Sequence, residues 1–352
     1  QDNDAGDLVE LSNNFALPTA NLNFDVQIED GVRMHLRTYL SSRHHPEAWV
    51  KGGYFQIDKL DFIQEGLASE LMEKVRLRFG MDEINYGDTH FRRSDNAASM
   101  YNPFVGNYIM DSFTTEPYGE ISVFTNGFIG VLGASNGRLN QAPVSGDDGF
   151  AFFGKLGYDS QINEDLRVRL TGSFYNSTDK GTRDYLYNGD RAGAHYYNVL
   201  ESPNDARVSD FLPRFNPGYA YGTSFQINPF VKFQGVEFFG VFEVANGEQE
   251  IAPGTVREGS FTQIGAELIY RFGSNEDFYV AGRYNSVSGE ADDGAPTQDI
   301  SRINIGGGWF LTDYVMAKIE YVTSTYDGNG WNGTKFQGAE FSGINIEAVI
   351  GF

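Results

Sequence analysis

The chain has 352 residues, no cysteine and a formal net charge of −22, and 42 of its residues are glycine. This excess of acid argues against nucleic acid as a partner, because binding to phosphates requires a basic surface. A membrane-spanning helix is excluded as well, because no segment approaches the roughly 18 consecutive apolar residues that such a helix needs. A barrel of strands is not excluded, because lipid-facing and lumen-facing residues alternate along its strands and keep the mean hydropathy low.

Apolar and polar residues alternate with a period of two from near the N-terminus to the C-terminus. This is the period of a strand and not of a helix. The first residue is Gln1, which predicts a mature form from which an export signal has been removed. The alternation predicts sixteen strands, or fourteen if the first two, which have the weakest pattern, do not form. In chain order they lie near 8–15, 20–28, 32–42, 50–58, 73–85, 114–125, 128–136, 149–159, 165–176, 219–233, 236–246, 259–272, 278–288, 300–311, 314–325 and 339–352.

The connections between these strands alternate between short and long. Asn126-Gly127 and Gln234-Gly235 read as two-residue hairpin turns, and Glu29-Asp30-Gly31 as a three-residue turn with glycine in the left-handed position. The longer connections are polar, which is typical of one end of an outer-membrane barrel. They cover residues 86–113, 137–148, 177–218, 247–258, 289–299 and 326–338.

Two features depart from this pattern. Residues 61–72 predict a short helix on the side of the short turns. Pro229 falls within the strand predicted at 219–233, although proline has no N–H to donate to a sheet. We therefore expect Pro229 to lie near the end of its strand, at a bulge.

The last strand carries the clearest alternation, with Ile344, Ile346, Ala348 and Ile350 on one face and Phe352 at the end of the same face. We expect this face to contact lipid. The terminal phenylalanine resembles the C-terminal signature of outer-membrane barrels, which the barrel-insertion machinery recognises. The plan of the whole chain resembles the porin family.

The resemblance implies one domain, 1–352, folded as a single closed antiparallel transmembrane β-barrel in the bacterial outer membrane. It also implies long extracellular loops, short periplasmic turns, contact with lipid and lipopolysaccharide, and a homotrimer. In porins the third outer loop often folds into the lumen and narrows it. Here that loop is 86–113, and its charged residues are Asp88, Arg92, Arg93, Asp95 and Asp111.

Alternation also predicts which charged side chains face the lumen, and a densely charged inner face is normal in a water-filled pore. Twelve are basic: Arg33, Arg37, Arg76, Arg78, Lys155, Arg167, Arg169, Lys232, Arg271, Arg283, Arg302 and Lys318. Nine are acidic: Glu10, Asp25, Asp82, Glu120, Glu237, Glu243, Glu267, Glu320 and Glu347. The surplus of three positive charges predicts a near-neutral or mildly anion-preferring pore. The alternative is that these charges neutralise one another in ladders with no role in selectivity.

No pattern in the chain indicates a metal, a cofactor or an enzyme. His44 and His45 are adjacent, so their side chains diverge on an extended backbone and cannot easily share an ion. Ser41, His44 and Glu47 are residue types of a hydrolytic triad, but nothing resembles a nucleophile elbow. The sequence from Asp327 to Gly330 lacks the full spacing of a calcium loop.

Four tyrosines crowd the longest connection, 177–218, and either stack on sugar rings at the entrance or pack the loop onto the rim. They are Tyr185, Tyr187, Tyr196 and Tyr197. The sequence as a whole predicts a passive channel for small hydrophilic solutes and ions, because about 16 strands leave an aqueous lumen. The alternative is a plugged barrel that acts through its extracellular loops as a binding or assembly protein.

Overall fold

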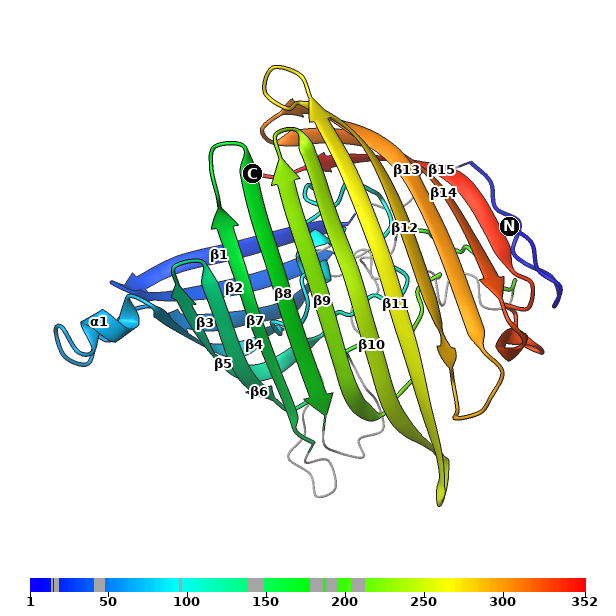
Figure 1. The fold of residues 1–352 in the computed structure, drawn as a ribbon, viewed down its shortest axis with the longest axis horizontal. Helices are drawn as coiled ribbons and strands as arrows, with labels where there is room; N and C mark the ends of the chain where they lie inside the picture. The colour runs from blue at the N-terminus through cyan, green and yellow to red at the C-terminus, as the bar shows by residue number, and fades with distance from the viewer. Residues whose placement is uncertain are drawn as a thin grey trace.

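The computed structural model describes residues 1–13, 15, 19–40, 48–94, 97–137, 149–177, 186–187, 195–203 and 213–352. Within these ranges, fifteen antiparallel strands form one sheet in which each strand pairs with the next along the chain (Figure 1). They are β1 (Ala20–Glu29), β2 (Val32–Leu40), β3 (Ala48–Ile57), β4 (Val75–Glu83), β5 (Thr115–Thr125), β6 (Phe128–Ser135), β7 (Ala151–Gln161), β8 (Leu166–Ser177), β9 (Tyr221–Phe233), β10 (Val236–Ala252), β11 (Thr255–Phe272), β12 (Phe278–Glu290), β13 (Gln298–Thr312), β14 (Val315–Asp327) and β15 (Glu340–Ile350).

Helical structure is confined to three short elements in the described part of the chain. These are α1 (Ser69–Met72), η1 (Thr89–Arg92) and η2 (Asn329–Trp331). The predicted helix at 61–72 is therefore confirmed only in its last four residues, and turns make up most of the rest. None of the described helices has the length and apolar character that a membrane crossing requires.

The predicted strand counts of sixteen and fourteen are both wrong, because the described sheet has fifteen strands. The strand expected at 8–15 is the one that does not form among the described residues. The Val9 N–H donates to the carbonyl of Glu201 in a long connection, 2.9 Å away, and Asp2 forms a bridge with Glu340. The first residues of the chain thus form backbone hydrogen bonds at the long-loop end of the sheet. The N-terminus lies there, beside β15, in Figure 1.

The prediction of a long connection at 247–258 is also wrong. Strands β10 and β11 continue past it as paired strands, and only Pro253 and Gly254 separate them. Gly254 has a φ of 76°, and proline followed by a residue of positive φ suits a tight turn. Polar residues fill both strands here because the hairpin projects beyond the apolar part of the sheet.

Pro229 lies four residues before the end of β9 and interrupts its pairing with β10. Pairs are formed at Phe239↔Phe230 and Phe242↔Ile227, and not between them. The Asn228 side-chain amide donates to the carbonyl of Gly240, at 3.2 Å, which replaces the N–H that proline lacks. Gly240 is required opposite the ring, because a Cβ there would lie 2.7 Å from Cγ of Pro229.

The two faces of the sheet differ in the way the alternation predicts. Ile344, Ile346, Ala348 and Ile350 of β15 are all exposed on the outer face, which carries most of the exposed large apolar side chains. The inner face carries the charged residues and the loops that pack on them. Strands β1 and β15 are the two edges, and no pairing joins them in the described residues.

Candidate functional site

The charged residues predicted to face inward differ in how far they are buried. Ten of them are buried: Lys155, Arg283, Arg302, Lys318, Asp82, Glu120, Glu237, Glu243, Glu267 and Glu320. Arg33, Arg37, Arg76, Arg78, Arg169, Arg271 and Glu347 are partly exposed, and Arg167 is exposed. Glu10 is not on the inner face, because its segment is not a strand.

The connection between β4 and β5, residues 84–114, lies against the inner face and is held there by its backbone. Side chains on four strands accept its N–H groups. Asn228 accepts from Asp88 at 2.8 Å, and Gln263 accepts from Met110 at 2.9 Å. Asn285 accepts from Ile109 at 2.6 Å, and Glu320 accepts from Gly106 at 3.1 Å.

Ion pairs from the first part of the same loop reach two parts of the wall. Arg92 contacts Glu237 at 3.0 Å and Glu267 at 2.5 Å, and Arg93 pairs with Asp111 at 2.9 Å within the loop. Asp88 reaches Lys155 of β7 at 2.9 Å and Arg169 of β8 at 2.8 Å. Asp95 lies outside the described residues. The predicted constriction loop therefore crosses from the β7–β8 wall to the β9–β14 wall.

A second connection, between β8 and β9, also packs on the inner face, which the sequence did not indicate. Tyr187 and Tyr86 both donate to Glu243 of β10, at 2.9 and 3.0 Å. Tyr196 donates a short hydrogen bond to Glu320 of β14, and His195 pairs with Glu347 of β15 at 2.7 Å. Tyr187 and Tyr196 thus pack inside the sheet and not on the rim; Tyr185 lies outside the described residues.

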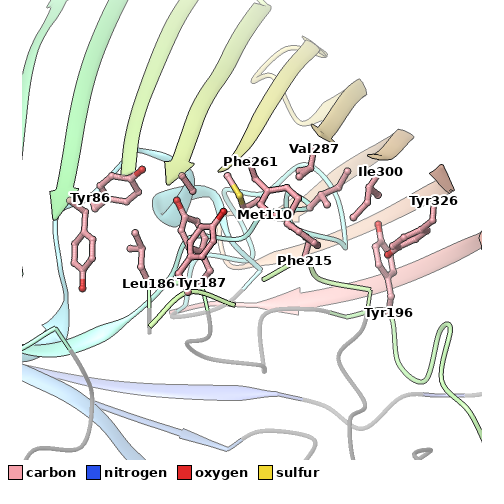
Figure 2. Packing of buried hydrophobic residues seen from close by; sticks show 14 of the residues in the cluster. Tyr86, Met110, Leu186, Tyr187, Tyr196, Phe215, Phe261, Val287, Ile300 and Tyr326 are labelled. Carbon is pink, nitrogen blue, oxygen red and sulfur yellow. The ribbon is translucent and has the colours of Figure 1, made fainter. Parts of the chain in front are cut away.

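An apolar cluster forms where these loops meet the strands. Figure 2 shows Leu186, Tyr187 and Phe215 of the second connection beside Met110 of the first, facing Phe261 of β11. Phe215 and Phe261 are in edge-to-face contact with ring centroids 4.7 Å apart. At the long-loop end of the interior, the described connections and strands thus pack apolar and aromatic side chains together, beside buried charged residues such as Glu243 and Glu320.

The short-turn end of the interior is more open and carries both signs of charge. One cavity of about 610 Å³ is lined by three basic and four acidic side chains, and another of about 580 Å³ by two of each. The basic residues are largely paired, as in Arg76 with Asp58 and Arg167 with Asp159, both at 2.8 Å. Charges of both signs thus surround the open space at this end of the interior.

The described residues contain no group of three or more side chains that could hold a metal ion. Ser41, His44, His45 and Glu47 lie outside the described residues, so the structure does not bear on their proposed roles. Asp327 accepts a hydrogen bond from Thr325 of its own strand at 3.1 Å.

No protein-family model matches the chain, and no curated protein matches its sequence. Solved structures match its fold. OmpF of Salmonella typhi is 12% identical with a TM-score of 0.55, over 94% of this chain and 89% of that one. The trimer form of OmpT, an outer-membrane protein of Vibrio cholerae, is 12% identical with a TM-score of 0.54, over 94% and 90%.

An anion-selective porin from Comamonas acidovorans is 9% identical with a TM-score of 0.53, over 95% of this chain and 89% of that one. The chain has the fold of the outer-membrane porins. At these identities the likeness is one of fold, and the solutes that the chain handles must be argued from its own residues.

Proposed function

We propose that this protein is a porin of the bacterial outer membrane, a passive, non-enzymatic channel for ions and small hydrophilic solutes. The observation that carries the proposal is the contrast between the two faces of the sheet. The outer face exposes apolar side chains such as Ile346 and Leu268, while the inner face carries Arg76, Arg167 and Glu237 around open cavities. A charged inner face in a sheet with an apolar outer face is the arrangement of a water-filled barrel.

The proposal includes closure of the sheet in the membrane. An unpaired strand edge in lipid leaves backbone N–H and C=O groups without partners, which costs several kcal/mol for each group. β1 and β15 are the two edges, and we propose that they meet. Because the strand number is odd, these two strands run in the same direction and would pair in parallel.

Three further properties belong to the proposal. The protein resides with lipid and lipopolysaccharide, and the insertion machinery recognises the C-terminal strand through Phe352. It assembles as a homotrimer, which the trimer form of OmpT supports. Residues 84–114 constrict the lumen, as their contacts with β7, β8 and β9–β14 suggest.

The charges nearest the open cavities decide the selectivity that we propose. Arg76 and Arg167 line these cavities and keep 32% and 47% of their side chains exposed, whereas Glu243, Glu267 and Glu320 are buried. Ions in the lumen meet the exposed charges at close range, and those buried beneath protein at longer range. Partners such as Asp58 and Asp159 offset much of the positive field. We therefore expect a pore that is near neutral or mildly prefers anions.

The test is the reversal potential in planar bilayers across a KCl gradient at high salt, where charges at the mouth are screened to about 3 Å. Replacement of Arg76, Arg78, Arg167 and Arg169 by glutamine should move the reversal potential toward cation preference. The matched control replaces Arg257, on the projecting β10–β11 hairpin, and should leave it unchanged. Strong cation selectivity of the unmodified protein at high salt would contradict the proposed preference.

One observation favours a second candidate function, a plugged barrel that acts through its outer loops. The apolar cluster around Phe215 and Phe261 fills the long-loop end of the interior (Figure 2). A permanent plug of this kind would give a folded protein that never conducts.

A further inference from the structure

The larger open cavity, of about 610 Å³, combines charges of both signs with aromatic rings. Its three bases stand on β8, β9 and β11, and three of its four acids lie in the turns that follow β11 and β13. Two half-buried rings, Phe230 of β9 and Phe310 of β13, line it as well. A cavity of this volume can hold a small organic molecule, and its polar groups then fix the orientation of that molecule.

Three of the charged groups in this cavity keep hydrogen-bonding capacity for a solute. Arg271 of β11 has only a loose contact, 3.5 Å to Glu237, which Arg92 already holds at 3.0 Å. Asp277 and Asp313 form no side-chain hydrogen bond or ion pair with any described residue. The other two bases of the cavity each pair with an acid at 2.8 Å. Arg271 and the two aspartates are therefore the groups most free to bind a ligand.

The backbone brings one base, one acid and one ring of this set together. Arg271 pairs with Tyr279 across β11 and β12, and Asp277 lies two residues before Tyr279. Such diagonal neighbours on one face of a sheet lie about 7–8 Å apart. The backbone N–H of Phe310 donates to the carbonyl of Asp277 at 2.8 Å, so β13 carries this ring next to the acid. Arg271, Asp277 and Phe310 thus share one corner of the cavity.

The ring of Phe310 is only partly covered by protein. It packs against the buried cluster that contains Phe104 and Met316, and its centroid lies 6.3 Å from that of Tyr279. The rest of the side chain borders the cavity. Apolar surface that faces water is unfavourable, and a solute with an apolar group would cover it. A cavity that only passed inorganic ions would gain nothing from this ring.

We propose that this cavity binds an aromatic α-amino acid. The carboxylate of the ligand accepts hydrogen bonds from Arg271, whose planar guanidinium matches its geometry. The ammonium group of the ligand donates to Asp277, and the ring packs on Phe310. A simple anion would be repelled by Asp277 and a simple cation by Arg271, so a ligand that carries both charges fits best. The inference names a solute class for the channel and rests on the proposed function.

The experiment measures the binding of L-phenylalanine to the folded protein in nonionic detergent micelles by saturation-transfer NMR, with empty micelles as the blank. Three analogues each lack one group of the ligand. Hydrocinnamate lacks the ammonium group, phenethylamine lacks the carboxylate, and L-alanine lacks the ring. Each should bind on the order of tenfold more weakly than L-phenylalanine, the effect of losing one charge-assisted hydrogen bond or one buried ring.

Two variants assign the charged contacts. Arg271→Gln should weaken the binding of L-phenylalanine on the order of tenfold and should not weaken that of phenethylamine, which has no carboxylate. Asp277→Asn should weaken L-phenylalanine by a similar factor and should not weaken hydrocinnamate. The matched controls, Arg257→Gln and Asp293→Asn, lie in connections at the long-loop end and should bind like the wild type. All variants are first checked for heat-modifiable migration, so that only folded barrels are compared.

The outcomes separate the binding site from the channel. If the wild type conducts but binds L-phenylalanine no better than L-alanine, the site is overturned and the channel stands. If Arg271→Gln and Asp277→Asn bind L-phenylalanine as their controls do, these residues do not hold the ligand and the inference is wrong. If the folded protein binds L-phenylalanine as expected and never conducts, the proposed function fails and the site stands.

Discussion

Asp88 is the residue through which the loop of residues 84–114 makes its most extensive polar contact with β7 and β8. Its carboxylate accepts hydrogen bonds from Lys155 and Arg169 and, at 2.8 Å, from the hydroxyl of Thr171. Lys155 is buried, so it has no water to replace a lost partner. The contact therefore stabilises the folded protein only while Lys155 and Asp88 are both present and charged.

We expect Asp88→Asn to destabilise the protein by about 3–5 kcal/mol, because removing one partner leaves a buried charge without compensation. The midpoint of urea unfolding in detergent micelles should fall accordingly. Asp313→Asn, in an exposed short turn, is the matched control and should leave the midpoint within error. An Asp88→Asn midpoint equal to that of the control would show that the loop is held without this contact.

The same residue predicts a dependence on pH. Burial raises the pKa of Asp88, but Lys155 and Arg169 outweigh burial and hold the pKa well below the ordinary value of 3.8. A carboxyl whose pKa is lowered by folding stabilises the folded state fully above its unfolded pKa, and the contribution is lost as pH falls toward the folded pKa. The unfolding midpoints of wild type and Asp88→Asn should therefore stay apart down to about pH 4 and converge only below it.

At the scale of elements, alternation located the strands well wherever one face meets lipid. Leu166–Ser177 and Glu340–Ile350 appear almost as predicted, because each apolar residue on their outer face repeats the same signal. The alternation is lost where neither face of a strand contacts lipid. The β10–β11 hairpin projects beyond the apolar band and so resembled a loop, although Pro253-Gly254 marked its turn.

The packing of the loops could not be predicted, because it joins residues far apart in the chain. Tyr196 and Glu320 are 124 positions apart, and no sequence motif around either residue predicts that they form a contact. The tyrosines of this connection were noted, but alternation describes only strands and assigns no partner to a loop. The charge of Asp88 was likewise visible, and its partners Lys155 and Arg169 were not.

The C-terminal strand carries a prediction of its own. Phe352 is fully exposed at the end of the outer face of β15, where the insertion machinery would contact it. Deletion of Phe352 should reduce assembled protein in the outer membrane several-fold, and Phe352→Tyr should retain assembly. Heat-modifiable migration of membrane fractions measures both. Assembly of the deletion variant at the wild-type level would contradict the proposed role of this residue.

At the scale of the whole molecule, the acidic net charge of −22 and the proposed mild anion preference are compatible because they concern different places. The acid in outer loops and turns faces bulk solvent, where salt screens it. The arginines of β4 and β8 border the open cavities on the inner face, where low-dielectric walls focus their field. Under the proposed function, the two connections on the inner face limit how much of this interior solutes can reach.

Single-channel conductance of the purified, heat-modifiable protein in planar bilayers tests the central claim most directly. We expect discrete conductance steps in 1 M KCl. The steps should scale with salt concentration, as they do for a water-filled pore. A folded protein that inserts into the bilayer and shows no conductance steps at any voltage would contradict the account and favour the plugged barrel.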